Sequence, residues 1–366
     1  MPTQPFCRAD HIGSLLRPQA LKNGHKARAN GTIDDEAFVA IVDEAISDAV
    51  SMQEAIGLDA VTDGEFRRRS WFDGFVEAVD GLVHKPTQFA FVEDGEAKVP
   101  VPVPFANAPI RRSAGIATGE LDFVKTVAHK PIKITIPAPS VIHFHRGPDC
   151  ADPSVYPDMD QYWDDLIAVY RAEIAALGAA GLDYLQIDEV PVALLCDPAV
   201  RARVADWGWD WNALVDRYIS AVNEALSERP SDMVVGMHLC RGNYRGKWIA
   251  TGGYEPVAER LFAEAAVDRF LLEFDSERAG DFSPLRFVPA DKSVVLGLVS
   301  TKTPTLEPSD DLKRRIGEAA AYVPLERLAI SPQCGFGTTV GGAPMDEDDQ
   351  RRKLARVVET AGAVWS

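Results

Sequence analysis

Short apolar runs rich in β-branched residues recur along the chain and alternate with stretches of helical periodicity. Most of these runs are apolar through their middle, as is typical of strands that are buried on both faces. Eight strands are predicted, at residues 6–12, 60–63, 132–136, 184–187, 233–238, 269–274, 293–298 and 327–331.

Between these runs, apolar residues repeat at the spacing of an amphipathic helix. Asp34 stands where it can cap the first of these helices, and Gly181 follows the second as a helix-ending glycine. Six helices are predicted, at residues 34–56, 159–180, 210–228, 256–266, 309–321 and 346–361.

Strand–helix alternation repeated eight times predicts an α/β protein with a (β/α)₈ (TIM) barrel, which we expect to be a single catalytic domain over residues 1–366. An open doubly wound sheet is the alternative, but no Gly-x-Gly-x-x-Gly motif follows the first strand. Residues 82–129 exceed a normal connection between the second and third strands. Strand-like residues 88–92 and 99–104 predict an inserted hairpin there, folded over the barrel mouth.

Charge and composition narrow the class of protein. The formal net charge of −17 argues against a nucleic-acid partner, because phosphate contacts need a basic face. No apolar run reaches the length of about 18 residues that a membrane helix needs, and no secretory signal is evident, so we expect a cytoplasmic protein without a membrane partner. The five cysteines are too few and too widely spaced for a disulfide scaffold, which leaves metal binding, catalysis or burial.

Potential metal ligands follow three of the predicted strands, at the ends where barrel enzymes carry their chemistry. His238 and Cys240 end the fifth strand, and an extended segment points residues two apart to the same side. Glu273 ends the sixth strand and Cys334 follows the eighth. Each alone is equally compatible with a structural histidine, a buried cysteine or a rim ion pair. Together they predict a zinc site.

Two thiolates and a carboxylate would make the zinc electron-rich, which suits holding an incoming thiol as a thiolate better than generating hydroxide. We expect Glu273 to be the ligand that exchanges for the substrate sulfur, because a carboxylate oxygen is harder than a thiolate. Without such exchange, a closed four-ligand site would be structural.

Acidic and basic groups follow two more strands. Asp188 and Glu189 come after the fourth strand, where they could bind an ammonium group, shuttle a proton or favour a helix N-terminus. Glu65 follows the second strand and is expected to face the site. Arg67 opens a run of three arginines that either binds a carboxylate or forms a solvated face.

Two polar segments complete the predicted rim. Ile12 and Ser14 end the first strand, where a backbone group and a hydroxyl could hold a small carboxylate or form a plain turn. His143 and His145 follow the third strand in a His-x-His pattern. For His143 we favour a substrate-facing role over metal binding, because no carboxylate partner is evident.

This set of residues resembles the C-terminal catalytic barrel of cobalamin-independent methionine synthase, and especially its short single-barrel relatives. The resemblance runs from residues 12–14 to residues 332–335. It implies that His238, Cys240, Glu273 and Cys334 bind Zn²⁺. It also implies that Asp188 and Glu65 hold the amino group of an amino-acid thiol, while Ile12 and Ser14 contact its carboxylate.

The chain departs from that family pattern in three ways. The long synthases have a second barrel that contributes to the folate side. Lys302 stands where those enzymes have a histidine after the seventh strand, so we expect a cation that assists the leaving group. No aromatic platform for a pterin follows the third strand, where His143 and His145 stand instead.

The sequence therefore predicts a zinc-dependent S-methyltransferase of methionine biosynthesis that holds a homocysteine-like thiol as zinc thiolate and forms methionine or a related thioether. Its second partner would be a methyl donor: a methylated folate, a methylcorrinoid or a small methylated compound. The alternative is another zinc-dependent thiol alkyltransferase, such as one that opens an epoxide with coenzyme M. A metal-free porphyrinogen decarboxylase is disfavoured by the two rim cysteines. A binding module with structural zinc would show no affinity for thiols.

Overall fold

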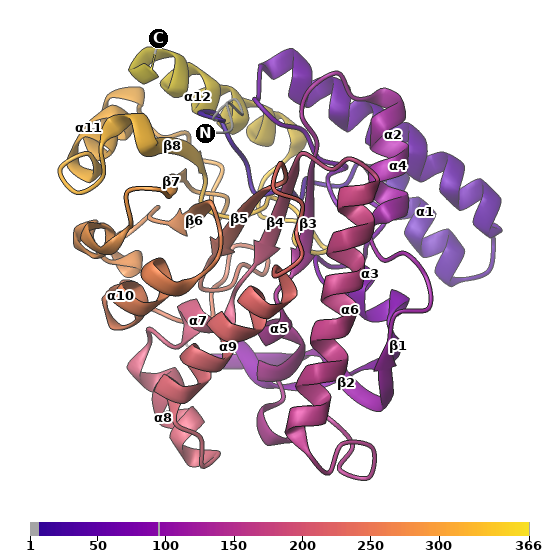
Figure 1. Ribbon diagram of the computed structural model, residues 1–366. Coiled ribbons are helices and arrows are strands. Elements are labelled where there is room, and N and C mark those ends of the chain that lie inside the picture. Colours follow the sequence, from indigo (N-terminus) through magenta and orange to yellow (C-terminus); the bar gives the residue numbers. More distant parts are fainter. Residues whose placement is uncertain (1–6, 94–95, 366) are drawn as a thin grey trace.

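A parallel sheet of six strands, in the order β3-β4-β5-β6-β7-β8, lies at the centre of the computed structural model, with helices around it (Figure 1). The structure describes residues 7–93 and 96–365. The strands are β1 (Asp80–Glu93), β2 (Glu96–Arg111), β3 (Lys133–Pro137), β4 (Tyr184–Asp188), β5 (Val234–Leu239), β6 (Arg269–Glu273), β7 (Ser293–Val299) and β8 (Leu328–Pro332).

Most helices lie in the connections between these strands. They are α1 (Gln19–Ala29), α2 (Asp35–Ile56), α3 (Asp73–Ala78), α4 (Thr118–Val127), α5 (Pro139–Phe144), α6 (Met159–Ala179), α7 (Pro191–Leu194), α8 (Pro198–Asp206), α9 (Trp211–Ala225), α10 (Glu255–Glu264), α11 (Ser309–Ala319) and α12 (Glu347–Trp365). Among the described residues, none of these helices combines the length and apolar character that crossing a membrane requires.

The third to eighth predicted strands agree with β3–β8 to within one residue at each end. Helix α2 also begins as predicted, because the Asp34 carboxylate accepts a hydrogen bond of 2.9 Å from the backbone N–H of Ala37. It ends at Gly57, whose φ of 99° is the left-handed conformation that glycine adopts readily.

The first two predicted strands, residues 6–12 and 60–63, do not form as regular strands, and residue 6 lies outside the described part. Each is reduced to one parallel bridge: Ala9 pairs with Ile330 of β8, and Val61 pairs with Ile132 next to β3. The Asp59 carboxylate accepts the N–H groups of Arg8 at 2.6 Å and of Ala9 at 3.0 Å. The Asp59 side chain therefore accepts the backbone N–H groups of Arg8 and Ala9, which a longer strand would donate to a neighbouring strand.

Strands β1 and β2 pair with each other in antiparallel register and contain the strand-like residues 88–92 and 99–104. Both strands extend beyond the predicted residues, because the pairing continues past the bulges that shift its register. Helix α4 follows within the same long connection. Figure 1 shows this hairpin at the end of the molecule where α7 and α8, which follow β4, also lie.

A buried ion pair joins this connection to the sheet. The Arg68 guanidinium donates from Nε to Glu120 of α4 at 2.8 Å and from Nη2 to the backbone oxygen of Thr135 in β3 at 2.8 Å. Only 5% of Arg68 and 7% of Glu120 is exposed to solvent. The pair thus connects α4 to β3 across the interior.

Replacing Glu120 by alanine should lower the free energy of unfolding by about 3 kcal/mol, because the buried Arg68 loses its directly bonded carboxylate and keeps only Glu65, at 4.0 Å. The control is Glu77→Ala, which removes the exposed partner of Arg69 and should cost less than about 1 kcal/mol. Urea denaturation of both variants measures the difference. Equal effects would show that the Arg68–Glu120 pair does not hold α4 to the sheet.

Candidate metal and substrate site

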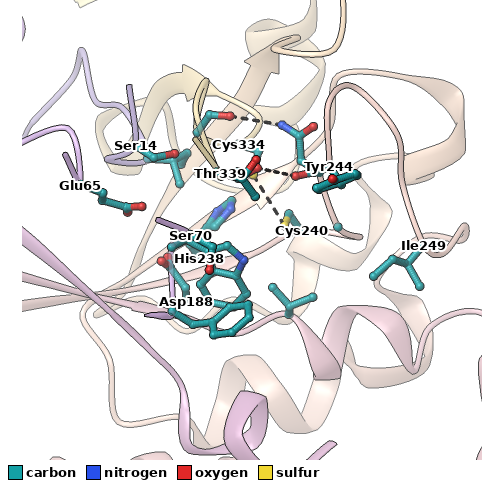
Figure 2. A pocket seen from close by; sticks show the side chains of 18 of the residues that line it. Ser14, Glu65, Ser70, Asp188, His238, Cys240, Tyr244, Ile249, Cys334 and Thr339 are labelled. Carbon is teal, nitrogen blue, oxygen red and sulfur yellow. Dashed lines mark hydrogen bonds between the residues drawn. The ribbon is translucent and has the colours of Figure 1, made fainter. Parts of the chain in front are cut away.

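Three potential metal ligands come together at the carboxyl ends of β5 and β8. One ligand atom each of His238, Cys240 and Cys334 lies within 4.8 Å of the others, and all three side chains are buried. The Cys334 thiol donates a hydrogen bond to Cys240 Sγ across 3.8 Å (Figure 2). Both cysteines are free. Parallel pairing of β5 through β8 brings these residues to the same edge of the sheet.

The surroundings of His238 and Cys240 favour metal binding. His238 Nδ1 lies 3.2 Å from the backbone oxygen of Leu271, and a carbonyl can only accept, so Nδ1 carries the proton. His238 Nε2 is buried and has no hydrogen-bond partner among the described residues, which leaves it available to a metal. The hydrogen bond from Cys334 lowers the pKa of the Cys240 thiol well below its usual range. One imidazole and two sulfurs fit zinc or a similarly soft ion.

Glu273, the fourth ligand implied by the sequence, is not part of this close group in the described structure. Its carboxylate instead accepts hydrogen bonds from Lys302 Nζ at 2.9 Å, from the Arg278 guanidinium and from the backbone N–H of Arg241 at 2.8 Å. Burial would raise the pKa of Glu273, but the charges of Lys302, Arg241 and Arg278 outweigh it and lower the pKa to about 2. The group is therefore a carboxylate surrounded by cations.

A cavity opens beside the three ligands, and four other predicted residues line it. Ile12, Ser14, Glu65 and Asp188 share its wall with His238, Cys240 and Cys334. Figure 2 shows Glu65 and Ser14 on one side of the cysteine pair and Asp188 next to His238. Segments far apart in the sequence thus contribute to a single site.

Glu65 reaches the cavity through a strained turn. Asp63 Oδ1 accepts the backbone N–H of Glu65 at 2.8 Å, and both Gly64 and Glu65 have positive φ, of 68° and 61°. A non-glycine residue in this conformation costs energy and is often found at functional sites. Glu65 Oε1 accepts from Thr135 Oγ1 at 2.8 Å, whereas the buried Oε2 has no partner among the described residues. Burial raises the pKa of Glu65.

Asp188 is oriented by groups deeper in the sheet. Gln186 Nε2 donates to Asp188 Oδ1 at 2.7 Å and to the backbone oxygen of Ile12 at 2.6 Å. Lys133 Nζ in turn donates to Gln186 Oε1 at 3.1 Å, which orients the amide. Burial raises the pKa of Asp188 to about 7. The buried Gln186 amide therefore holds both the Asp188 side chain and the backbone at Ile12, and both of these residues line the cavity.

Besides Glu273, three predicted site residues do not line the cavity. Arg67 forms an ion pair with Asp43 of α2, and Lys302 is occupied by Glu273 and by Asp275. His143 lies in α5, because the chain turns into a helix directly after β3 rather than remaining extended. That helix directs His143 into an aromatic cluster, where its Nδ1 lies 3.0 Å from Tyr218 Oη.

Several lining residues escaped sequence reasoning. Trp71 and Phe72 line the cavity as an edge-to-face aromatic pair with ring centroids 5.2 Å apart. They follow the arginine run after a single residue, Ser70, whereas aromatic residues are considered in the sequence only after the third strand. Asn243 contributes from the segment after β5, and of the predicted His-x-His pair it is His145, not His143, that lines the cavity. The predicted hairpin reaches the cavity through Thr87 and Val103.

A parallel α/β sheet with a buried His–Cys–Cys group and two carboxylates around one cavity defines the class: an α/β protein with a candidate metal-dependent active site. The chain belongs to the family described as "Cobalamin-independent synthase, Catalytic domain", whose model matches residues 7–362.

Relatives resemble the chain over nearly its whole length. The uncharacterized protein YxjH of Bacillus subtilis is 37% identical, over 99% of this chain and 95% of that protein. A methionine synthase of Pyrococcus furiosus is 25% identical, over 98% of this chain and 93% of that protein. The crystal structure of a candidate vitamin-B12-independent methionine synthase from Listeria monocytogenes superimposes with a TM-score of 0.78 and 33% identity, covering 100% of both chains.

Metal analysis tests the ligand group directly. Protein loaded with zinc and freed of excess metal should hold one ion per chain, and His238→Ala or Cys334→Ser should lose it because two donors do not retain the ion. Cys196→Ser is the matched control, since Cys196 is also buried but its thiol donates only to the backbone oxygen of Val192. Retention of the full metal content by both ligand variants would rule out this site.

Proposed function

We propose that the protein is a zinc-dependent methyltransferase that activates a homocysteine-like thiol and forms methionine or a related thioether. The observation that carries this proposal is the cavity wall, where the His238–Cys240–Cys334 group faces the same space as Glu65 and Asp188. A soft-metal group beside two carboxylates matches an acceptor that has a thiol at one end and an ammonium group at the other.

His238, Cys240 and Cys334 would hold the ion. When bound there, zinc would lower the pKa of the acceptor thiol and keep its sulfur nucleophilic near neutral pH. The protein contributes the orientation of His238 through Leu271 and a buried setting for both cysteines. Such outer hydrogen bonds fix the tautomer and the direction of a histidine ligand.

The carboxylates would bind the amino group of the acceptor. Glu65 offers its unpaired Oε2, and Asp188 is held toward the cavity by Gln186. Ser14 and the segment at Ile12 would receive the acceptor carboxylate. An ammonium between two buried carboxylates forms strong charge-assisted hydrogen bonds, so this arrangement would select an amino-acid thiol over a simple one.

The remaining wall would face the methyl donor. Trp71, Phe72, Val103 and Ile249 make this part aromatic and apolar, which suits the body of a folate, a corrinoid or a small methylated compound. Lys302 is paired with Glu273 and Asp275 and does not line the cavity, which argues against the predicted role in assisting the leaving group. The donor would approach past the hairpin, which would exclude water from the reacting atoms.

The function of the relatives supports this proposal, because the protein of Pyrococcus furiosus is named a methionine synthase. We also propose that the chain is a single catalytic barrel domain. The bridges at Ala9 and Val61 place the two missing strand segments beside β8 and next to β3, and a backbone hydrogen bond of 3.2 Å joins Asp59 to Ala9. These contacts are the ones that closure of the barrel would require.

Calorimetry on zinc-loaded protein tests the acceptor. Homocysteine should bind more tightly than coenzyme M or glutathione, and Glu65→Gln should weaken homocysteine binding roughly ten- to hundredfold by removing one charged contact. The same variant should bind the desamino thiol 4-mercaptobutyrate unchanged, which controls for damage to the site. Selective binding of coenzyme M would favour the alternative alkyltransferase, and binding of no thiol would reject both enzymes.

A further inference from the structure

A buried guanidinium, that of Arg17, bonds two of the segments that form the cavity wall. Arg17 is 1% exposed to solvent and does not itself line the cavity. Its Nη1 donates to the backbone oxygen of Gly337 at 2.6 Å, and its Nη2 donates to those of Glu65 at 2.9 Å and Arg68 at 2.6 Å. One side chain therefore connects the loop after β8 to the turn that carries Glu65.

The charge of Arg17 is costly in this position. Its three hydrogen bonds go to backbone oxygens, and Nε has no hydrogen-bond partner among the described residues. Burial lowers the pKa of Arg17 to about 10, and the carboxylates of Glu65 and Asp63 oppose this shift, so the group stays charged near neutral pH. An apolar side chain would fill the same space without the cost of a buried charge. What only arginine offers here is a planar fork of donors that can bind carbonyls of two segments at once.

The turn at Glu65 needs such support. Both Gly64 and Glu65 have positive φ, and for Glu65 this conformation is unfavourable unless the surrounding structure enforces it. Arg17 bonds the backbone oxygen of the strained residue itself, and the backbone N–H of Leu15 bonds that of Gly64 at 3.1 Å. Without these contacts the turn would relax and carry away the Glu65 carboxylate, whose Oε2 is unpartnered among the described residues.

The loop after β8 is packed just as closely against the segment that carries Arg17. This loop begins with Cys334, and its glycines leave no room for a side chain. A Cβ atom at Gly335 would collide with Ser14 Oγ, and one at Gly337 would collide with the backbone oxygen of Leu15. The loop and residues 14–17 therefore cannot shift independently of each other.

We infer that Arg17 is a positioning residue for the acceptor, because it holds the Glu65 turn against the loop after β8. It thereby fixes the span between the carboxylate proposed for the ammonium group and the cysteine end of the cavity. The inference rests on the proposed function for the identity of the acceptor. It assigns Arg17 no contact with the substrate, since Arg17 acts only through Glu65.

Calorimetry on the zinc-loaded full chain tests this role with homocysteine and 4-mercaptobutyrate, which differ only in the amino group. Arg17→Lys keeps the positive charge but lacks the fork that spans both segments. It should weaken homocysteine binding about tenfold and 4-mercaptobutyrate binding by less than about threefold, because only homocysteine uses the Glu65 carboxylate. In a Glu65→Gln background, the same change should weaken homocysteine binding by less than about threefold, because the group that Arg17 positions is already gone.

The matched control is Arg327→Lys, because Arg327 also donates to two backbone oxygens, those of Pro289 at 2.6 Å and Lys292 at 2.9 Å, and does not line the cavity. It should leave both affinities unchanged. Equal losses of both thiols in Arg17→Lys, or a homocysteine loss that persists in full beside Glu65→Gln, would show a merely structural role and overturn the inference.

A crystal structure of the unmodified zinc-loaded protein with homocysteine decides the matter if Arg17→Lys does not fold or does not retain zinc. Arg17 on its three backbone oxygens with Glu65 on the amino group supports the inference. Release of the Glu65 backbone oxygen by Arg17, or an amino group bonded elsewhere, overturns it.

The outcomes separate this inference from the proposed function. Failure of homocysteine to bind the unmodified protein rejects the proposed acceptor and the role of Arg17 together. Homocysteine binding that Arg17→Lys does not weaken, or weakens equally with 4-mercaptobutyrate binding, overturns the inference alone and leaves the proposed function standing.

Discussion

Parallel, sequential pairing of β3 through β8 is the constraint on which the site depends. Because every strand of such a sheet runs in the same direction, residues at the carboxyl ends of different strands meet at one edge. Asp188 of β4 is directly opposite His238 of β5, and Glu273 of β6 is opposite Gly297 of β7. The alternation of side chains along β5 then turns His238 and Cys240 toward the same side.

Burial of charge divides this edge into two parts. In one part, the Glu273 carboxylate forms ion pairs with Lys302, Arg278 and Arg241, so its negative charge is neutralised by the protein itself. Around the cavity, by contrast, His238 Nε2 and Glu65 Oε2 are buried without partners among the described residues. Unsatisfied buried polar atoms are costly, and a group that binds there would remove that cost.

This division also explains what the lysine does at the position where the long synthases have a histidine. Lys302 does not reach the cavity and instead joins Glu273 to Asp275. Lys302 thereby forms part of the charged environment of Glu273. The geometry of this chain brings His238, Cys240 and Cys334 together, and it surrounds Glu273 with Lys302, Arg278 and Arg241.

Local pattern was sufficient for much of the fold and for part of the site. The apolar runs of β3 to β8 and the capping signals of α2 are short-range features, so the sequence predicted them to within a residue or two. The grouping of His238, Cys240 and Cys334 also followed from strand order, because residues at parallel strand ends must converge.

Only the tertiary structure decided the partners of those residues. The Asp59 carboxylate replaced part of the expected ladder at Ala9, and the early helix α5 turned His143 away from the cavity while His145 reached it. The three cations on Glu273 come from segments after β5, β6 and β7. Sequence alone determined which chemical groups stand at the sheet edge. Which of them are already satisfied depends on contacts between distant segments, because neutralisation of a buried charge is a matter of distance in space.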